Sequence, residues 1–587
     1  MSSYKVGQID VLHQDNIRPP HGEPRSPSRT ILEPGHRRTE KNRPIVVETI
    51  LESDQILTMR DGVTLRADVY RPVTNEKVPA IIMYGPYGKS GSGWFNIDKF
   101  AFRVGIPESK LSGYENFEGL DPAEWVPRQY AIVNVDARGI NDSEGNVRWW
   151  GSGEGEDGHD TVEEIAKLPW CSGKVSMAGN SWLAACQWYT AAQQPPHLAC
   201  IAPMEGISDP LRENLCRGGI PNTRFAAPLS ASFIGRGQRE DMPAMVAKYP
   251  DNNEYWDDRR AKMEDIKVPS YIVASYSTGL HTVGSFRGFE EMASKDKWIS
   301  VHATQEWYDL YTKERTDDLQ KFMDRYLKGI DNGWENTPRV RYAFICFNKD
   351  SEVNVPFTDL PWNLSSATEN RLFLLADRKL LSTKASEPGQ VTYQADAPSK
   401  LMGPDPDDPF FSYTFLQQTR LAGPSTAILY VSSPSSNDMD VHVQLRKADK
   451  NGEVLAYANI PLKDIGVSTV TDVPNTNVMK YLGPTGMLRA SRRHVSEALS
   501  SRSRSWRTLS HSQVEPVAPG NVVRLEIQLW PTGMIFDAGE RLLLYVSGHY
   551  MTLPEFETMP PYENPNRGEH IIHVGGEYDS SLMFYQV

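Results

Sequence analysis

The chain contains few cysteines and no pattern that would pair them. There are five, at Cys171, Cys186, Cys200, Cys216 and Cys346, and no two of them form a CxxC pair. Disulfide frameworks and structural zinc sites use even sets or closely spaced pairs, so we expect neither here. Unpaired cysteines are typical of a reducing compartment, and we therefore predict a cytoplasmic protein.

The sequence also lacks a long apolar run and an excess of positive charge. No stretch approaches the roughly 18 apolar residues of a membrane-spanning helix, and the first 30 residues contain no apolar signal-type segment. The formal net charge is −13. Because nucleic acids and anionic membranes bind clustered Lys and Arg, we expect neither as a partner and predict a small-molecule substrate instead.

Motifs for metals and cofactors are missing as well. The histidines show neither HExxH nor a carboxylate–His metal spacing. The glycine-rich stretch "GSGEGEDG" at 151–158 lacks the Lys-Ser/Thr that ends a phosphate-binding loop, and it lacks the dinucleotide spacing. The sequence therefore predicts no metal ion and no organic cofactor.

Residues 1–44 differ in composition from the rest of the chain. They are rich in Pro, Arg and His and have almost no apolar periodicity. Such a segment cannot bury enough apolar surface to form a core of its own. We predict a flexible N-terminal arm, which could wrap a neighbouring subunit and so support a homo-oligomer.

Residues 45–206 and 266–340 contain short apolar runs separated by helix-length segments. The runs include "VPAIIMYGP", "YAIVNVDARG" and "VPSYIVASYS", and one intervening segment is "WLAACQWYTAAQQ". Nearly continuous apolar runs indicate parallel strands buried on both faces, so we predict a doubly wound α/β domain. The strand pattern stops over 207–265, which we expect to be a helical cap insertion above the C-terminal edge of the sheet.

Residues 341–587 have a third pattern. Short β-branched and aromatic runs, such as "TAILYVSS", "VVRLEIQLWP" and "RLLLYVSG", alternate with Gly, Pro, Asn and Asp. This pattern is typical of an all-β sandwich or jelly roll. We therefore predict a separate C-terminal β domain.

Ser181 lies where a predicted strand, "KVSMAGN", meets a predicted helix. A serine on such a tight turn projects its hydroxyl off the sheet beside a helix N-terminus, which favours developing negative charge. A serine at this position can also simply cap the helix. Leu183 replaces the second small residue of the usual G-x-S-x-G pattern, so this segment alone leaves both interpretations open.

Four motifs around Ser181 resemble one family. "YGPYGKS" (84–90), "DARGINDSEGN" (136–146), "EDGHDTVEEIAKLPWCSGKVSMAGNSW" (156–182) and "IAPMEGISD" (201–209) are similar in order and spacing to the cocaine esterase-like, or CocE/NonD, hydrolases related to X-prolyl dipeptidyl peptidases. The segment 486–548 is similar to the jelly-roll domain of that family. The resemblance covers roughly 45–587 and implies an α/β-hydrolase domain with a helical cap, followed by a jelly roll.

The resemblance also implies roles for three residues. Ser181 would be the nucleophile of an acyl transfer. The hydroxyl of Tyr87 and the backbone N–H of Trp182 would form the oxyanion hole. Preorganised donors of this kind lower the barrier of acyl transfer by about 3–4 kcal/mol each.

The general base is harder to assign, because a serine nucleophile needs a His oriented by a carboxylate. In doubly wound hydrolases the acid follows one late strand and the His follows the next, which confines the search to 273–284 and 299–311. The first segment should carry an Asp near Ser277 or Thr278 and carries none. In the second segment His302 ends the strand and is the best match to the family's His.

Other residues in the two segments offer alternatives. His281 is a nearby alternative base. Glu306 and Asp309 follow His302 and could replace the missing acid, or they could be surface charges on a helix. Either the acid has moved, or the triad has decayed.

Three functional hypotheses follow. The first is a serine hydrolase that cleaves an ester or amide bond of a small molecule through an acyl-enzyme on Ser181. The second is a hydrolase fold used for non-hydrolytic carbonyl chemistry, as a cyclase, lyase or isomerase, because the triad acid is missing. The third is a non-catalytic binding protein.

Overall fold

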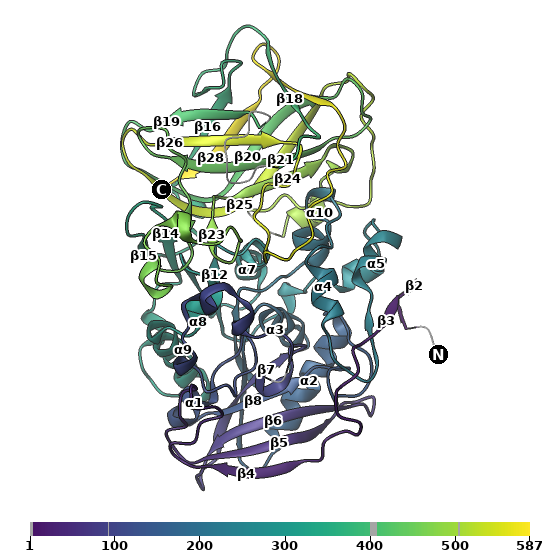
Figure 1. Ribbon diagram of the computed structural model, residues 1–587, viewed down its shortest axis with the longest axis vertical. Helices are drawn as coiled ribbons and strands as arrows, with labels where there is room; N and C mark the ends of the chain where they lie inside the picture. Colours follow the sequence, from purple (N-terminus) through teal and green to yellow (C-terminus); the bar gives the residue numbers. More distant parts are fainter. Residues whose placement is uncertain (1–3, 92, 400–407, 503–504) are drawn as a thin grey trace.

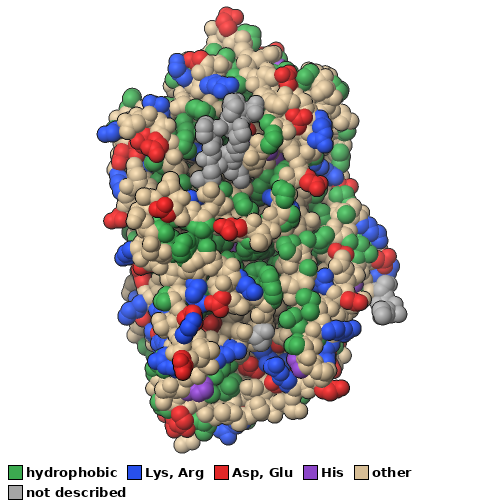
Figure 2. Space-filling model, viewed as in Figure 1, with side chains coloured by type: hydrophobic (Ala, Val, Ile, Leu, Met, Phe, Trp, Pro, Cys, Tyr) green, Lys and Arg blue, Asp and Glu red, His purple; other side chains and the backbone are tan. Residues whose placement is uncertain are grey.

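The computed structural model describes residues 4–91, 93–399, 408–502 and 505–587. An α/β domain and a β domain lie one above the other in Figure 1, with the cap helices at the side between them. The predicted doubly wound sheet and the predicted all-β C-terminal domain are both present. Figure 2 shows Lys and Arg side chains interspersed with Asp and Glu over both domains on the face in view.

The centre of the α/β domain is an eleven-stranded sheet with the order β15-β14-β13-β12-β10-β9-β7-β8-β6-β5-β4. Seven consecutive strands of it run parallel: β7 (Val78–Gly85), β8 (Ala131–Asp136), β9 (Cys171–Asn180), β10 (Leu198–Met204), β12 (Ser270–Ser275), β13 (Lys297–His302) and β14 (Val340–Phe344). Every residue of β7, β8 and β12 is buried. Burial on both faces explains why these strands appear in the sequence as continuous apolar runs.

Antiparallel strands extend the sheet at both edges. They are β4 (Ser28–Leu32), β5 (Thr49–Thr58) and β6 (Thr64–Pro72) at one edge and β15 (Glu352–Phe357) at the other. Short ladders also involve β1 (Lys5–Val6), β2 (Ile9–Asp10) and β3 (His13–Asp15).

Two boundaries differ from the sequence-based expectation. Residues 1–44 were expected to be a flexible arm, but Ser28–Leu32 pairs with β5 because its backbone groups complete the ladder of an open sheet edge. The β domain was expected to begin at 341, but β14 and β15 continue the α/β sheet through Phe357.

Helices cover the sheet and form the cap. The longer ones are α2 (Ser152–Ala166), α3 (Trp182–Ala192), α7 (Thr282–Glu291) and α9 (Lys313–Leu327), with α1 (Pro122–Trp125) and α8 (Glu306–Leu310) shorter. The residues between β10 and β12 include α4 (Ala226–Ala231), α5 (Met242–Lys248) and α6 (Glu254–Asp258), and one strand, β11 (Gln238–Glu240), which pairs with β3. The N-terminal segment thus lies against the cap of its own chain.

The β domain consists of two stacked sheets. One contains β16 (Thr368–Leu374), β17 (Leu380–Leu381), β18 (Gly389–Gln394), β20 (Thr419–Ser432), β25 (Val523–Phe536), β27 (Glu569–Val574) and β28 (Ser581–Gln586). The other contains β19 (Phe410–Thr414), β21 (Asp440–Ala448), β24 (Thr485–Arg489) and β26 (Arg541–Ser547). A small pair, β22 (Tyr457–Ala458) and β23 (Lys480–Tyr481), and helix α10 (Glu497–Ser500) lie in their connections.

Backbone hydrogen bonds join the two domains. The N–H of Ile345, just after β14, donates to the carbonyl of Gly533 in β25 at 2.8 Å, and Ile535 donates to Ile345 at 3.0 Å. A Cβ on Gly533 would lie 2.2 Å from the carbonyl oxygen of Ala343, so only glycine allows this approach.

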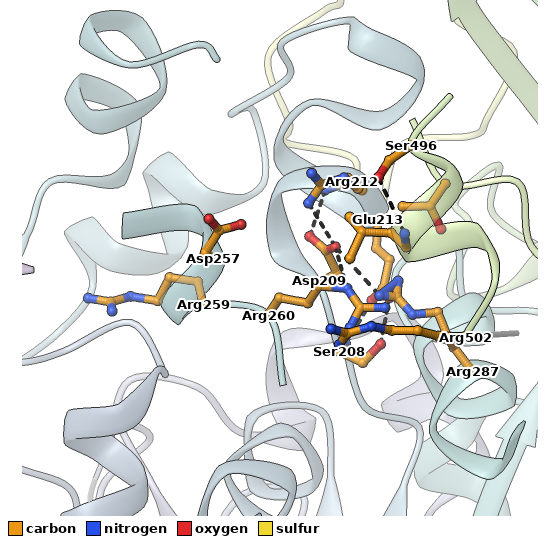
Figure 3. Close-up of polar contacts among 12 residues, drawn as sticks. Ser208, Asp209, Arg212, Glu213, Asp257, Arg259, Arg260, Arg287, Ser496 and Arg502 are labelled. Atoms are coloured by element: carbon orange, nitrogen blue, oxygen red, sulfur yellow. Dashed lines mark hydrogen bonds and ion pairs between the residues drawn. The ribbon is translucent and has the colours of Figure 1, made fainter. Parts of the chain in front are cut away.

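A buried ion cluster holds the start of the cap against α7, as Figure 3 shows. Asp209 is fully buried and has three arginine neighbours: Arg212 at 3.0 Å, Arg260 at 3.4 Å and Arg287 at 3.5 Å. Burial alone would raise the pKa of Asp209, but the three guanidinium groups lower that pKa to about 2. The cluster therefore holds a carboxylate that is charged throughout the neutral range.

We expect Asp209→Asn to lower the free energy of unfolding by about 3–5 kcal/mol, because it removes the carboxylate that three buried guanidinium groups share and leaves Arg212 without an ion-pair partner among the described residues. Chemical denaturation monitored by fluorescence would measure this, with Asp317→Asn, which removes an exposed partner of Lys313, as the control.

A depressed pKa of Asp209 stabilises the fold above the unfolded pKa of about 4 and ceases to do so as the pH falls through about 2. The difference between wild type and Asp209→Asn should therefore be constant above about pH 4 and shrink below it. Equal stability of wild type and variant at pH 7 would contradict the assignment.

Candidate active site

Ser181 occupies the sharp turn between β9 and α3. Its backbone has φ 55° and ψ −116°, a conformation that non-glycine residues rarely adopt. Ser181 is half-buried, whereas the residues on both sides of it are buried. This is the strained strand-to-helix geometry that exposes a serine hydroxyl at the edge of an α/β sheet.

Tyr87 lies next to Ser181, two residues after the end of β7. Its hydroxyl is 3.4 Å from Ser181 Oγ, and its ring is buried between aromatic neighbours, among them Phe117. Burial, and next the negative charge of Glu118, raise the pKa of Tyr87 well above 10. The hydroxyl therefore keeps its proton and can donate it in a hydrogen bond.

Glu118 is a buried residue that the sequence analysis did not select. Its Oε1 accepts a hydrogen bond from Trp307 Nε1 at 2.9 Å, and its backbone carbonyl accepts one from the N–H of Asn180 at 3.0 Å. Burial and the charge of Glu306 raise the pKa of Glu118 well above 4.5. No short motif marks this position, because Glu118 belongs to an irregular loop before α1.

Trp182 begins α3 directly after Ser181. Its indole Nε1 donates to Glu154 Oε1 at 2.7 Å, and the ring packs against Trp149 and Trp150. The side chain thus braces the turn. As the first residue of α3, Trp182 has a backbone N–H with no preceding helical turn to bond, and its role in an oxyanion hole stays a prediction.

Glu205 is the carboxylate that follows β10, and sequence reasoning missed it. It is fully buried with φ 59°, and its Oε2 accepts hydrogen bonds from Ser275 at 2.8 Å and Thr278 at 2.9 Å. Its backbone carbonyl accepts the N–H of Ser181 at 3.1 Å. The available signal was its position, since "IAPMEG" places a carboxylate directly after the strand beside the Ser181 strand.

His302 ends β13, as predicted, and both of its ring nitrogens face protein groups. Nε2 lies 2.8 Å from Glu205 Oε1, and Nδ1 lies 3.2 Å from the hydroxyl of Thr304. Asp309 is 3.8 Å from Nδ1 and binds Arg315 at 2.6 Å. Burial favours a higher pKa for Asp309, but the charge of Arg315 outweighs it, and the pKa is lowered.

Glu306 contacts His281, which corrects the expectation that it would orient His302. His281 Nδ1 lies 3.0 Å from Glu306 Oε2, and both side chains are buried. His281 precedes α7 in the loop after β12, whereas Glu306 begins α8 after β13. Because β12 and β13 are neighbours in the sheet, their following loops meet. The structure thus places a His where the fold usually has an acid, and an acid where it usually has a His.

Burial and like charges control the electrostatics of this site. Burial lowers the pKa of His281 despite nearby Glu205 and Glu118, so the imidazole is neutral at neutral pH. Burial and the charges of Glu205 and Glu555 raise the pKa of Glu306 well above 4.5. The ligand atoms of Glu205, His281 and Glu306 lie within 4.8 Å of one another, so this set could hold a cation, although the sequence predicted no metal site.

The turn at Ser181 depends on Gly179. Its φ is 127°, and a Cβ there would lie 2.7 Å from Leu183 Cβ. We expect Gly179→Ala to displace Ser181 and to abolish its labelling by a fluorophosphonate probe, measured by mass spectrometry. Gly173→Ala in the same strand is the control, because Gly173 also has a positive φ but an added Cβ would meet only His197 Cδ2, at an ordinary contact distance of 3.8 Å. Equal labelling of the two variants would show that the close packing at Gly179 does not position Ser181.

Comparisons with known proteins identify families and structures that are similar to this chain. A family model described as "X-Pro dipeptidyl-peptidase (S15 family)" matches residues 61–306, and one described as "X-Pro dipeptidyl-peptidase C-terminal non-catalytic domain" matches residues 332–583. Cocaine esterase of a Rhodococcus strain is 32% identical over 27% of this chain and 24% of that protein. The structure of an α-amino acid ester hydrolase, 15% identical, superposes with a TM-score of 0.62 over 90% of this chain and 95% of that one, which shows the fold alone.

One solved structure extends the similarity to nearly the whole molecule. It is a CocE/NonD family hydrolase from Staphylococcus aureus, 30% identical to this chain with a TM-score of 0.80. The match covers 92% of this chain and 94% of that one. Together with the two matching family models, this similarity shows that the chain belongs to the CocE/NonD family of hydrolases, which is related to the X-Pro dipeptidyl peptidases.

Proposed function

We propose that this hydrolase cleaves an ester or amide bond of a small molecule through an acyl-enzyme on Ser181. The observation that carries the proposal is the strained conformation of Ser181 together with the Tyr87 hydroxyl 3.4 Å from its Oγ. A nucleophile and a donor for the developing oxyanion are thus held side by side. The names of similar proteins, which include esterases and an ester hydrolase, support the same bond type.

The oxyanion hole in this proposal consists of Tyr87 and the N–H of Trp182. The raised pKa of Tyr87 keeps its hydroxyl protonated, and the N-terminus of α3 adds a favourable dipole. Glu118 lies close enough to Tyr87 to raise the pKa of its hydroxyl further. Donors fixed before the reaction stabilise the tetrahedral intermediate without reorganising.

We assign the general base to His281 rather than His302. A triad base needs one ring nitrogen for the acid and the other for the serine. Nε2 of His302 contacts Glu205 at 2.8 Å and its Nδ1 contacts Thr304 at 3.2 Å, whereas neither an ion pair nor a hydrogen bond engages Nε2 of His281 among the described residues. In this proposal His281 is therefore the general base, and Glu306 is the acid that orients it. The His lies in the loop after β12 and the acid after β13, the reverse of the usual arrangement.

The steps follow from these roles. His281 Nε2 accepts the proton of the Ser181 hydroxyl as Oγ attacks the carbonyl carbon, and the oxyanion is held by Tyr87 and Trp182. His281 then gives the proton to the leaving alcohol or amine, leaving an ester on Ser181. Water, activated by His281 in the same way, hydrolyses that ester. Hydrogen bonds of this kind are often long before substrate binds, so the single Tyr87 partner of Ser181 Oγ among the described residues is no obstacle.

The non-hydrolytic hypothesis rested on an absent triad acid, and it loses that basis because Glu306 places a carboxyl group beside His281. The hypothesis of a non-catalytic binding protein has no support from the similar proteins, which are hydrolases. We also propose a reducing, cytoplasmic location, supported by five cysteines that are all free and buried. No helix in the described ranges is long and apolar enough to span a bilayer. A small-molecule substrate and a homo-oligomer formed through the N-terminal arm stay predictions.

We expect Ser181→Ala, His281→Asn and Glu306→Gln each to lower kcat/KM by about 10⁴-fold or more, because each removes a member of one proton-transfer unit. The assay is hydrolysis of a panel of short-chain p-nitrophenyl esters. His302→Asn should lower kcat/KM far less, and circular dichroism would check that every variant is folded. If His302→Asn is inactive while His281→Asn is active, the assignment of the base is reversed.

Tyr87→Phe should lower kcat by about 10²- to 10³-fold with little change in KM, since it deletes one oxyanion donor but keeps the ring packing. Tyr84→Phe is the matched control, because Tyr84 is a buried residue of β7 whose hydroxyl does not contact Ser181. Full activity of Tyr87→Phe in the same ester assay would remove Tyr87 from the oxyanion hole.

A further inference from the structure

A cavity of about 250 Å³ lies between the cap, the start of α7 and the β domain. Six arginines and two glutamates are among its lining residues, and Figure 3 shows one wall of it at Arg212, Glu213 and Arg287. Five of the arginines already have carboxylate partners: Arg212 pairs with Asp209, Arg287 with Glu213, Arg493 with Glu515, and Arg507 and Arg524 with Glu526.

Arg217 is the sixth arginine and differs from the others. It is 8% exposed, donates to the hydroxyl of Thr485 at 3.1 Å and to its carbonyl, and lies 4.0 Å above the ring of Trp530. Burial lowers the pKa of Arg217 to about 10, so it stays charged at neutral pH. Among the described residues no carboxylate forms an ion pair with it.

A buried charge without a counter-charge is unfavourable for the fold. The buried charge of Arg217 nevertheless lies beside a cavity that could hold a ligand. Its planar guanidinium group can donate two parallel hydrogen bonds to the two oxygens of a carboxylate. The two carboxylates near Arg217 are already engaged, since Glu213 pairs with Arg287 and Glu555 accepts a hydrogen bond from Asn477. A ligand with an anionic group would therefore supply the missing partner.

Arg217 also connects this cavity with the candidate active site. A narrower cavity of about 30 Å³ is lined by Arg217 and by Gly279 and Leu280, the two residues before His281. Glu213, Arg217 and Met487 line both cavities, so the two adjoin. An anionic group bound at Arg217 thus lies next to the loop that carries the proposed base.

We propose that Arg217 binds a carboxylate of the substrate, and that the enzyme acts on esters or amides that carry a free carboxylate away from the bond that is cleaved. This inference rests on the proposed function, because it extends the same active site. In this arrangement the cavity between the cap and the β domain holds the free carboxylate of the substrate, and the carbonyl group that reacts lies at Ser181.

The test compares matched substrates. Monoethyl esters of the dicarboxylic acids from succinic to suberic are paired with ethyl esters of monocarboxylic acids of the same chain length, and hydrolysis is followed by chromatography. Wild type should prefer the half-esters in kcat/KM. Arg217→Met should lower the ratio of half-ester to neutral ester by about 10- to 100-fold, as expected for loss of a charged hydrogen bond. Arg217→Lys, which keeps the charge without the fork, should give an intermediate ratio.

Arg492→Met is the control variant. Arg492 also joins the cap to the β domain, through Asp251, but does not line the cavity, so the wild-type ratio should persist. Propionate and inorganic phosphate, tested as competing inhibitors, distinguish a carboxylate site from a phosphate site. Stronger inhibition by phosphate, or an unchanged ratio in Arg217→Met, would overturn the proposal.

A binding experiment separates this proposal from the assignment of catalysis. Calorimetry of monoethyl adipate with the Ser181→Ala protein should show binding that is lost when Arg217→Met is added. Binding that depends on Arg217 without any turnover by wild type would overturn the proposed hydrolysis but support the carboxylate site. Turnover of neutral esters by wild type with no binding of the half-ester would support the proposed hydrolysis and overturn the carboxylate site.

Discussion

The hydrogen-bonded register of β9, β10, β12 and β13 determines where the groups of the candidate site lie. Asn180 pairs with Met204, Met204 with Val273, and Ser275 with His302. Parallel strands that end at the same level place the residues that follow them at one edge of the sheet. Ser181 and Glu205 directly follow the two residues of the first of these pairs, and the loops that carry His281 and Glu306 leave the same edge. The site residues are spread over more than 120 positions between Ser181 and Glu306. The register of the strands, rather than closeness in the sequence, therefore brings them together.

The site contains more buried charge than stability alone would favour. Glu118 and Glu306 have raised pKa values because they are buried close to other carboxylates, and Arg217 is a buried cation that forms no ion pair with another described residue. Elsewhere the protein pairs its buried charges, as Asp209 shows with three arginines. Buried ionisable groups with shifted pKa values beside a strained serine and a cavity are the pattern expected where chemistry or ligand binding compensates the cost of burying them.

An exchange of His and acid between two neighbouring loops is compatible with triad chemistry. A triad requires an imidazole with an acid on one nitrogen and the nucleophile on the other, and it does not require that a particular strand supplies either group. His281 and Glu306 lie 3.0 Å apart from opposite loops, which meets the first part of that requirement. In the proposed mechanism Glu306 therefore supplies the carboxyl group that the fold usually places near Thr278.

The sequence by itself determined the fold class, the family resemblance and the serine that we propose as the nucleophile. Continuous apolar runs predict parallel buried strands, and the turn at Gly179 and Ser181 predicts an exposed hydroxyl, because both signals are local in the chain. Pairing between distant residues is not local. The sequence could not show that Glu306 contacts His281, that Glu205 faces His302, or that Ser28–Leu32 closes a sheet edge. The tertiary structure decides those contacts, because strand order and register bring together side chains that are far apart in the sequence. Their separation along the chain does not predict their distance in space.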